Sequence, residues 1–315
     1  MNEHSMQQIC VKSVNISEKK GTIKKPVDAI ELTNQGVNGD AHSGPWNRQV
    51  SMLGLESIRK FEQQAGRSIL HGEFAENITT EGIELWNAKP LDRFISGDLE
   101  LEVTQIGKEC HGSSCNIFRE VGNCVMPKEG IFARVLHNGT LRSGDILEYH
   151  PRIFRILIIT LSDRAFRKEY EDKSGPRIAE LVGEYFANAG MACNIALELI
   201  PDDPNNLGSL LYKAKDELTD LIFTTGGTGI GPRDFTPDVV KPLLDIEIPG
   251  IMEAIRMKYG IEKPAALLSR SVAGVMGKSI IFTLPGSVRA VNEYMNEISR
   301  SLMHLVYMLH GLDIH

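Results

Sequence analysis

The chain has 315 residues, of which 42% are hydrophobic and 24% charged, and its formal net charge is −7. This composition is typical of a folded globular protein and excludes intrinsic disorder, and the length favours two domains over one. The negative charge and the absence of a long Lys/Arg block argue against nonspecific nucleic-acid binding, which depends on many phosphate contacts.

No segment reaches the ~20 apolar residues of a membrane span, and the N-terminal residues lack the apolar core of a signal peptide. We therefore expect a cytoplasmic protein that has no membrane partner. Five cysteines in a reducing compartment favour thiols over a disulfide framework. Cys10 and Cys193 are expected to pack in the protein interior.

Residues 1–150 predict a mainly β domain. Short alternating or apolar segments such as Leu99–Ile106 are broken by Gly, Asn and Asp, and one amphipathic helix is predicted at Ser51–Gln64. This pattern ends at Arg142–Arg152, where a long apolar run follows. We therefore expect two domains, residues 1–150 and residues 151–315.

Thiols cluster in the first domain, where Cys110, His111, Cys115 and Cys124 lie close in sequence. Thiolate and imidazole ligands suit zinc or an Fe–S centre, and a thiol can also carry sulfur or bind a metal that another ligand already holds. The spacing matches neither a Cys-x-x-Cys zinc knuckle nor a ferredoxin run, so buried packing is the alternative interpretation.

The first half contains the segments Gly36–His42, Arg48–Leu53, Gly72–Gly82, Gly130–Leu136 and Ser143–Leu147. Together they resemble the MOSC domain, which also occurs at the C-terminus of molybdenum-cofactor sulfurases. The resemblance covers about residues 7–150 and implies a barrel-like β domain that binds the cofactor, carries sulfur or has another role. Asp40 and His42 lie in one of these segments and are either ligand contacts or structural residues.

Residues 151–315 predict an α/β domain, because strands alternate with helices and this alternation is typical of a largely parallel sheet. The expected strands are Ile153–Leu161, Cys193–Ile200, Leu221–Thr225 and Ile280–Leu284. The expected helices are Gly175–Ala189, Asn206–Glu217, one near Pro237–Leu244 and one after the last strand.

The third of these strands runs directly into the glycine-rich loop Gly226–Gly231. Glycines let backbone N–H groups approach an anion closely, and the next helix, with Thr236 as its expected N-cap and Pro237 at its first position, adds its positive end. Arg233 and Asp234 bring opposite charges to the same rim. The loop therefore predicts an anion site, with a glycine-rich turn and an exposed salt bridge as the alternative.

Polar residues also follow the first two expected strands, at the end of the sheet where open α/β sheets bind ligands. Ser162 and Asp163 follow the first strand, and Asp202 and Asp203 follow the second. Because the ends of parallel strands converge, these acids and Asp234 predict a divalent cation held against phosphates.

Further anion contacts are expected at Ser174-Gly175, where Ser174 is the expected N-cap of a helix, at Ser269-Arg270, and in the turn Pro285-Gly286-Ser287. The chain lacks the Gly-Lys-Ser/Thr ending of a P-loop and the glycine spacing of the dinucleotide fingerprint. An ordinary NTPase or dehydrogenase is therefore disfavoured.

Six motifs of this half, in their order, resemble the MogA-type molybdopterin adenylyltransferases over residues 155 to about 300. The related MoaB-type domains typically have Ser-Asp-Thr-Arg where this chain has Ser162-Asp163-Arg164, which favours the adenylyltransferase. The motifs are Leu161–Arg164, Tyr170–Pro176, Ile200–Asp203, Thr224–Gly229 with Arg233–Pro237, Leu268–Arg270 and Leu284–Ser287.

This resemblance implies a three-layer, commonly trimeric α/β domain that binds molybdopterin and ATP at the strand ends and needs Mg²⁺. It implies that Asp202 and Asp234 are the two catalytic acids, with Mg²⁺ beside them. Nucleotidyl transfer requires mainly positioning and charge neutralisation, so these groups suffice without a protein nucleophile. The expected substrate contacts are Ser162, Asp163, Ser174, Gly175, Gly226, Gly227, Thr228, Gly229, Arg233, Ser269, Arg270, Pro285, Gly286 and Ser287.

We therefore expect a bifunctional protein of molybdenum-cofactor assembly. Its second half transfers AMP from ATP to molybdopterin, and its MOSC half binds or modifies the same cofactor, handling its sulfur or its metal. Other cofactor-assembly proteins or molybdoenzymes are the expected partners. The alternatives are a non-catalytic carrier of the cofactor and a regulatory protein that senses nucleotide or oxyanion.

Overall fold

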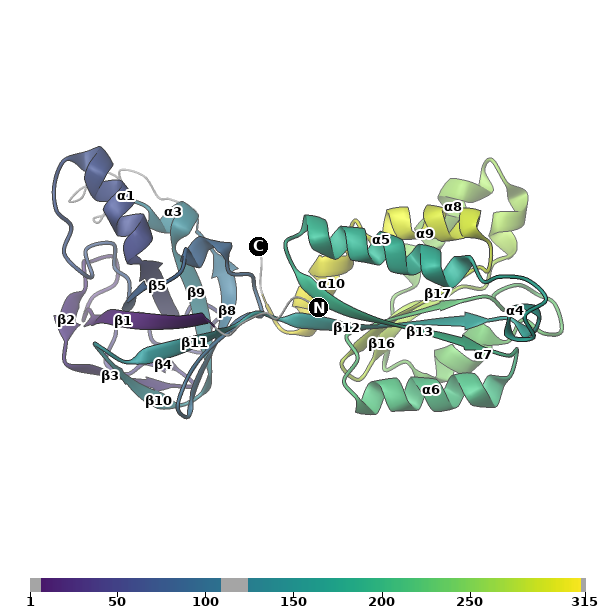
Figure 1. The fold of residues 1–315 in the computed structure, drawn as a ribbon, viewed down its shortest axis with the longest axis horizontal. Helices are drawn as coiled ribbons and strands as arrows, with labels where there is room; N and C mark the ends of the chain where they lie inside the picture. The colour runs from purple at the N-terminus through teal and green to yellow at the C-terminus, as the bar shows by residue number, and fades with distance from the viewer. Residues whose placement is uncertain (1–6, 109–123, 313–315) are drawn as a thin grey trace. The chain divides into compact units, whose positions relative to one another are not determined.

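The computed structural model describes residues 7–108 and 124–312, and no helix within these ranges is long and apolar enough to cross a bilayer. The described chain forms two compact units (Figure 1). The first contains residues 7–108, 124–152 and Leu312, and the second contains Ile153–Gly311. Cys110, His111 and Cys115 lie outside the described residues.

The first unit consists mainly of strands, as predicted. The strands are β1 (Gln7–Ile16), β2 (Lys25–Val27), β3 (Ala29–Thr33), β4 (Gly36–Val37), β5 (Val50–Gly54), β6 (Ile78–Glu81), β7 (Arg93–Ser96), β8 (Leu99–Ile106), β9 (Ile131–His137), β10 (Gly139–Arg142) and β11 (Ile146–His150). In the order β11-β7-β8-β9-β5-β6-β1 they form a ring, which closes because β1 also pairs with β11. β2 pairs with β1, and β10, β3 and β4 form a separate sheet.

Apolar residues with the period of a strand fill this barrel. Along β1, Ile9, Val11 and Val14 are fully buried in the barrel core. The step from Val11 to Val14 is three residues instead of two because the register of β1 against β6 shifts between Val11 and Ser13. An extra residue of this kind is a β-bulge, which restores the inward direction of the side chains after it.

The predicted helix at Ser51–Gln64 is wrong over its first four residues. Residues Val50–Gly54 form β5, in which every residue is buried between β6 and β9, and helix α1 (Leu55–Ala65) begins only after Gly54. The apolar residues of β5 match the apolar face of a helix as well as they match a buried strand. Pairing with two neighbouring strands therefore decides the conformation. The other helices in the described part of this unit are η1 (Leu85–Asn87) and α3 (Met126–Glu129).

The second unit alternates strands and helices. Its strands are β12 (Ile153–Leu161), β13 (Ala192–Ile200), β14 (Leu221–Thr225), β15 (Ile246–Glu247), β16 (Ala273–Met276) and β17 (Ser279–Leu284). Its helices are α4 (Asp163–Phe166), α5 (Ser174–Asn188), α6 (Pro204–Asp216), α7 (Thr236–Val240), η3 (Lys241–Leu243), α8 (Pro249–Gly260), η4 (Pro264–Leu268), α9 (Val288–Ile298) and α10 (Leu302–Leu309).

The six strands form one sheet in the order β13-β12-β14-β17-β16-β15. The first four are parallel, and β16 and β15 are antiparallel to their neighbours. Helices α5 and α9 cover one face of the sheet and α6 and α7 the other, which confirms the predicted three-layer α/β fold (Figure 1). The central strand β14 is buried along its whole length, as parallel strands covered on both faces are.

Two predicted helix N-caps are wrong. Lys173 is the N-cap of α5, and the buried Ser174 donates its hydroxyl to Asp172 Oδ1 over 2.9 Å. Thr236 is the first residue of α7, which places Pro237 second, and its hydroxyl donates to the carbonyl oxygen of Gly226 over 2.9 Å. Ser174 bonds to a carboxylate two residues before it, and Thr236 bonds to a carbonyl oxygen of the glycine loop. Each helix therefore begins one residue earlier than expected.

Candidate functional site

The carboxyl ends of β12, β13 and β14 bring the predicted polar residues together. The backbone N–H of Asp202 donates to Asp163 Oδ1 over 3.1 Å, and Asp163 Oδ2 lies 3.9 Å from Arg233 Nη1. β12 lies between β13 and β14, so the strand order reverses beside it. Open parallel sheets bind ligands at such a switch point, at the carboxyl ends of the strands.

A cleft of about 350 Å³ lies at this end of the sheet, and we call it the Asp202 cleft. Both predicted catalytic acids line it, together with positive charge from two arginines. Its residues are Leu161, Ser162, Arg164, Asp202, Gly227, Gly231, Pro232, Arg233 and Asp234, of which Arg164 was not among the predicted contacts.

A second cleft, of about 530 Å³, shares Gly227 and Asp234 with the first, and we call it the Tyr294 cleft. It contains the predicted residues Thr228, Gly229, Ser269, Pro285, Gly286 and Ser287. It also contains residues that sequence reasoning missed, namely Tyr259, Tyr294, Arg256, Lys263 and Arg289. Tyr294 occupies a buried position of the amphipathic helix α9, so its sequence pattern is that of a core residue.

The glycine loop between the clefts presents unused backbone donors. In the described parts of the chain, the N–H groups of Gly227, Thr228, Gly229 and Ile230 donate to no protein acceptor. Gly226 and Gly227 adopt left-handed φ values of 104° and 62°, and a Cβ at Gly229 would lie 2.7 Å from Asp234 Oδ2. Consecutive free N–H groups form a concave anion site, and the left-handed backbone at Gly226 and Gly227 favours glycine at these two positions.

Asp234 belongs to both clefts and is half-buried. Its Oδ2 accepts the N–H of Gly231 over 2.8 Å, so the loop itself holds the carboxylate in place. Mg²⁺ is usually bound by one or two carboxylates together with substrate phosphates, and Asp202 and Asp234 in one cleft fit that donor set. Within the described ranges, no group of three or more His, Cys, Asp or Glu that could hold a metal occurs.

The turn Pro285-Gly286-Ser287 packs directly against the glycine loop. Thr225 donates its hydroxyl to the carbonyl oxygen of Pro285 over 3.0 Å, and a Cβ at Gly286 would lie 3.4 Å from Gly226 Cα. Ser287 caps α9 by accepting the N–H of Ala290. The positive end of α9 therefore faces the Tyr294 cleft, where an anion would be stabilised.

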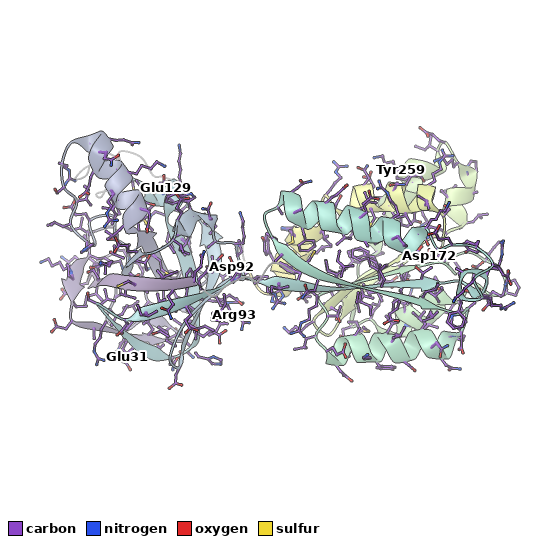
Figure 2. All side chains as sticks on the ribbon, in the orientation of Figure 1. Glu31, Asp92, Arg93, Glu129, Asp172 and Tyr259 are labelled. Atoms are coloured by element: carbon purple, nitrogen blue, oxygen red, sulfur yellow. The ribbon has the colours of Figure 1, made fainter. Side chains whose placement is uncertain are left out.

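Five predicted contacts line neither cleft: Asp163, Ser174, Gly175, Gly226 and Arg270. Ser174 and Gly175 instead belong to a turn around Asp172, whose position is labelled in Figure 2. Oδ1 of Asp172 accepts the N–H groups of both residues, and its Oδ2 accepts the hydroxyl of Thr160 over 2.7 Å. Direct substrate contact by these five residues stays a prediction.

The first unit contains a basic pocket of about 310 Å³, which we call the Arg48 pocket. Aromatic and cationic side chains line it, and no carboxylate does among the residues that the structure describes. Its side chains include His42, Trp46, Arg48, Asn77, Lys108 and Phe132. A pocket with unopposed positive charge and aromatic walls suits an anion attached to a ring.

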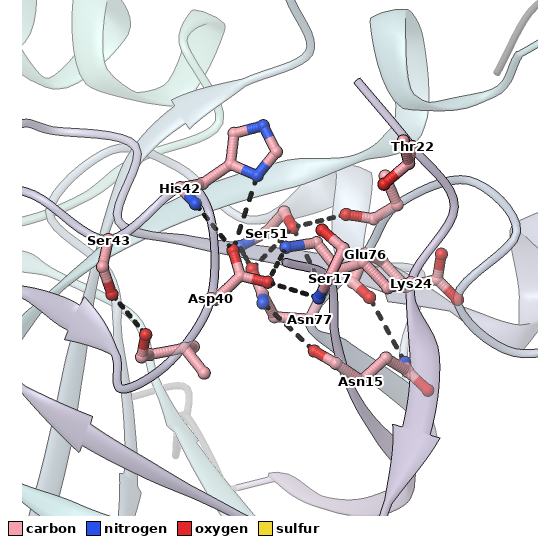
Figure 3. A network of polar contacts seen from close by, with 12 residues as sticks. Asn15, Ser17, Thr22, Lys24, Asp40, His42, Ser43, Ser51, Glu76 and Asn77 are labelled. Carbon is pink, nitrogen blue, oxygen red and sulfur yellow. Dashed lines mark hydrogen bonds and ion pairs between the residues drawn. The ribbon is translucent and has the colours of Figure 1, made fainter. Parts of the chain in front are cut away.

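A buried polar network holds one wall of this pocket (Figure 3). Asp40 Oδ1 accepts the backbone N–H of His42 over 2.9 Å, and Oδ2 accepts Lys24 Nζ over 2.5 Å and the N–H of Ser17 over 3.0 Å. Burial raises the pKa of Asp40, but the bonds from His42 and Lys24 outweigh it and hold that pKa below its usual value. Asp40 is therefore a structural anion, while His42 faces the pocket.

Of the four candidate ligands in the cysteine segment, only Cys124 falls within the described residues. It is half-buried and packs against the apolar cluster that contains Phe61, Phe74 and Met126. Metal, sulfur or cofactor binding by Cys110, His111, Cys115 and Cys124 stays a prediction.

The strand ends of this parallel sheet carry a loop of free N–H groups, two acids and two adjoining clefts. This arrangement is typical of proteins that bind phosphate-bearing compounds. Residues 157–304 match the family described as a probable molybdopterin binding domain, and residues 39–148 match the MOSC domain. The chain belongs to this molybdopterin-binding family of molybdenum-cofactor biosynthesis and also carries a MOSC domain, which confirms both resemblances.

Three relatives illustrate the match. The chain is 35% identical over 155 residues to the molybdopterin adenylyltransferase of Helicobacter pylori (strain J99), covering 49% of this chain and 86% of that protein. It is 38% identical over 164 residues to molybdenum cofactor biosynthesis protein B of Bacillus cereus, covering 51% and 93%. It is 37% identical over 158 residues to the molybdenum cofactor synthesis protein cinnamon of Drosophila melanogaster, covering 50% of this chain and only 26% of that protein.

Proposed function

We propose that the second unit transfers AMP from ATP to the phosphate of molybdopterin. The observation that carries this proposal is that two clefts share Gly227 and Asp234, one with both acids and two arginines, the other with tyrosines and cations. Two substrates can then meet at the glycine loop, with one in each cleft. The name of the Helicobacter relative supports the same activity.

In this reaction an oxygen of the molybdopterin phosphate attacks the α-phosphorus of ATP. The new P–O bond joins AMP to molybdopterin, the bond to the β-phosphate oxygen breaks, and pyrophosphate leaves with that electron pair. The free N–H groups of Gly227–Ile230 bind phosphate oxygens, and Arg164 and Arg233 neutralise their charge. Mg²⁺, when bound beside Asp202 and Asp234, would supply further charge neutralisation.

The test is to incubate the full-length protein with ATP, Mg²⁺ and molybdopterin. We expect adenylylated molybdopterin and pyrophosphate in equal amounts, measured by chromatography and a coupled pyrophosphate assay. If molybdopterin binds in a direct binding measurement but neither product forms, the protein is a carrier of the cofactor and the proposed activity is wrong.

The first unit is proposed to bind or modify the same cofactor, handling its sulfur or its metal. The Arg48 pocket supports this proposal, since its cations and aromatic side chains suit a ring compound that bears a phosphate. The thiols of Cys110, Cys115 and Cys124 would add ligands for a soft metal or a carrier for sulfur.

The two activities are expected to be separable. A fragment that begins at Pro151 should fold and adenylylate molybdopterin, because the boundary of the compact units lies after Arg152. Changing Cys110, Cys115 and Cys124 together to Ser in the full chain should leave adenylylation intact and abolish bound metal or persulfide, since a hydroxyl is a poor soft ligand.

Elemental analysis and persulfide labelling of the wild type and the triple variant are the measurements, with Cys193→Ser as the matched control in the second unit. If the wild type and the triple variant contain equal amounts of bound metal and persulfide sulfur, the three cysteines are packing residues. Loss of adenylylation in the triple variant would show that the two halves depend on each other.

A trimer and a cytoplasmic location also stay predictions. The edge strand β13 supports self-association, because Leu197 and Leu199 are exposed at 52% and 36%. An exposed apolar edge strand offers unpaired backbone groups to a second chain.

A further inference from the structure

Arg270 uses its guanidinium to hold the glycine loop. Its Nε donates to the carbonyl oxygen of Gly229 over 2.7 Å, its Nη2 donates to the carbonyl oxygen of Asp234, and its Nη1 donates to Asp238 Oδ1 over 2.8 Å. Its own backbone N–H donates to the carbonyl oxygen of Thr228 over 2.8 Å. All three guanidinium nitrogens therefore have protein acceptors.

This arginine is the main attachment of the loop from Thr228 onward, whereas Gly226 and Gly227 are held by Leu284 and Thr236. Within residues 7–108 and 124–312, the hydrogen bonds that join Thr228–Asp234 to a distant segment all come from Arg270. One further link is the ion pair of Arg233 with Asp163, at 3.9 Å and on the exposed rim. An exposed ion pair of this length contributes little, so the loop conformation depends on Arg270.

Through the geometry of the peptide unit, the hydrogen bonds from Arg270 also fix the direction of N–H groups in the loop. In a planar trans peptide, the carbonyl of one residue and the N–H of the next point in opposite directions. Because the carbonyl oxygens of Thr228 and Gly229 face Arg270, the N–H groups of Gly229 and Ile230 face away from it. These two N–H groups are among the four that have no acceptor in the described residues.

We propose that Arg270 is a positioning residue, which orients the N–H groups of the glycine loop toward a phosphate and does not itself contact the substrate. This differs from the direct anion contact that the sequence motif suggested. A planar guanidinium can reach two carbonyl oxygens at once, whereas the ammonium of lysine is a single point charge. The inference rests on the proposed function only for the identity of the phosphate compound.

The test compares pyrophosphate and Mg·ATP binding to the full-length wild type, Arg270→Ala and Arg270→Lys by calorimetry. Both variants are expected to bind pyrophosphate about 10- to 100-fold more weakly, because the N–H groups lose their orientation. Added methylguanidine should restore part of the affinity of Arg270→Ala. Arg300→Ala, which removes an exposed cation paired with Glu297 outside both clefts, should bind as the wild type does.

A second control separates the loop contacts from the ion pair. Asp238→Asn removes the charge opposite Nη1 and leaves the contacts to Gly229 and Asp234, so pyrophosphate affinity should change less than about threefold. If Asp238→Asn weakens binding as much as Arg270→Ala, or if Arg270→Lys binds as tightly as the wild type, charge matters rather than loop geometry and the inference is wrong.

Failure of the inference about Arg270 can be told apart from failure of the proposed adenylylation activity. Circular dichroism checks that each variant is folded. If Arg270→Ala does not fold, the comparison of the wild type with Arg270→Lys decides the test. Suppose that the wild type binds pyrophosphate, that both Arg270 variants bind it more weakly, and that no adenylylated molybdopterin forms. This result overturns the proposed activity and supports the role of Arg270. A wild type that adenylylates molybdopterin while Arg270→Lys has normal affinity and turnover overturns only the role of Arg270.

Discussion

Replacing Asp234 by Asn is expected to reduce the turnover number of adenylylation by roughly 10²- to 10³-fold. The carboxylate lies in both clefts, where it would support Mg²⁺ beside the triphosphate. Asn keeps the side-chain volume and can still accept the N–H of Gly231, so the loop should keep its shape. The loss should therefore appear in catalysis and not in folding or molybdopterin binding.

Steady-state rates at saturating Mg²⁺, together with direct binding of molybdopterin, test this prediction. Asp216→Asn is the matched control, since it removes an exposed carboxylate at the end of α6 that lines neither cleft. A near-normal rate for Asp234→Asn would show that Asp234 is not a catalytic acid.

Replacing Asp40 by Ala is expected to lower the free energy of unfolding of the first unit by about 3–5 kcal/mol. The side chains of Lys24 and Asp40 are each only 1% exposed, and they form an ion pair of 2.5 Å. Burial lowers the pKa of Lys24, whereas the hydrogen bond and charge of Asp40 favour the charged ammonium. Without Asp40 the buried ammonium loses its principal partner, and the N–H groups of Ser17 and His42 lose their acceptor.

Scanning calorimetry of the full-length protein tests this prediction, since only one of two transitions should move to lower temperature. Asp98→Ala, at an exposed position in the turn between β7 and β8, is the matched control. Adding Lys24→Met to Asp40→Ala should recover part of the loss because the unpaired charge is removed. A loss below about 1 kcal/mol, typical of an exposed pair, would contradict the prediction.

Local pattern was sufficient for the class of each domain and for much of the site. Alternation of strands and helices after Ile153 predicted the parallel sheet, and residues at the ends of parallel strands must converge. For this reason Asp202, Gly227 and Asp234 could be placed in one cleft from their sequence positions alone. The glycine spacing predicted the loop because only glycine permits such close backbone contacts.

Predictions from local sequence pattern were wrong where the same residues are compatible with two conformations. The segment Ser51–Gly54 fits a helix until β6 and β9 pair with it, and Ser174 and Thr236 could cap helices until other acceptors approach them. In each case the deciding partner is distant in sequence or bonds in another direction, so propensity is overridden by tertiary contacts.

The sequence by itself determined the two fold classes, the glycine-rich loop and the acids at the strand ends, because each depends on residues within one short segment. Only the tertiary structure decided that Arg270 holds the loop, that Tyr294 lines a cleft, and that Arg48 and Lys108 share a pocket. These roles depend on which distant segments meet, and that is set by the packing of helices and strands rather than by the spacing of a motif.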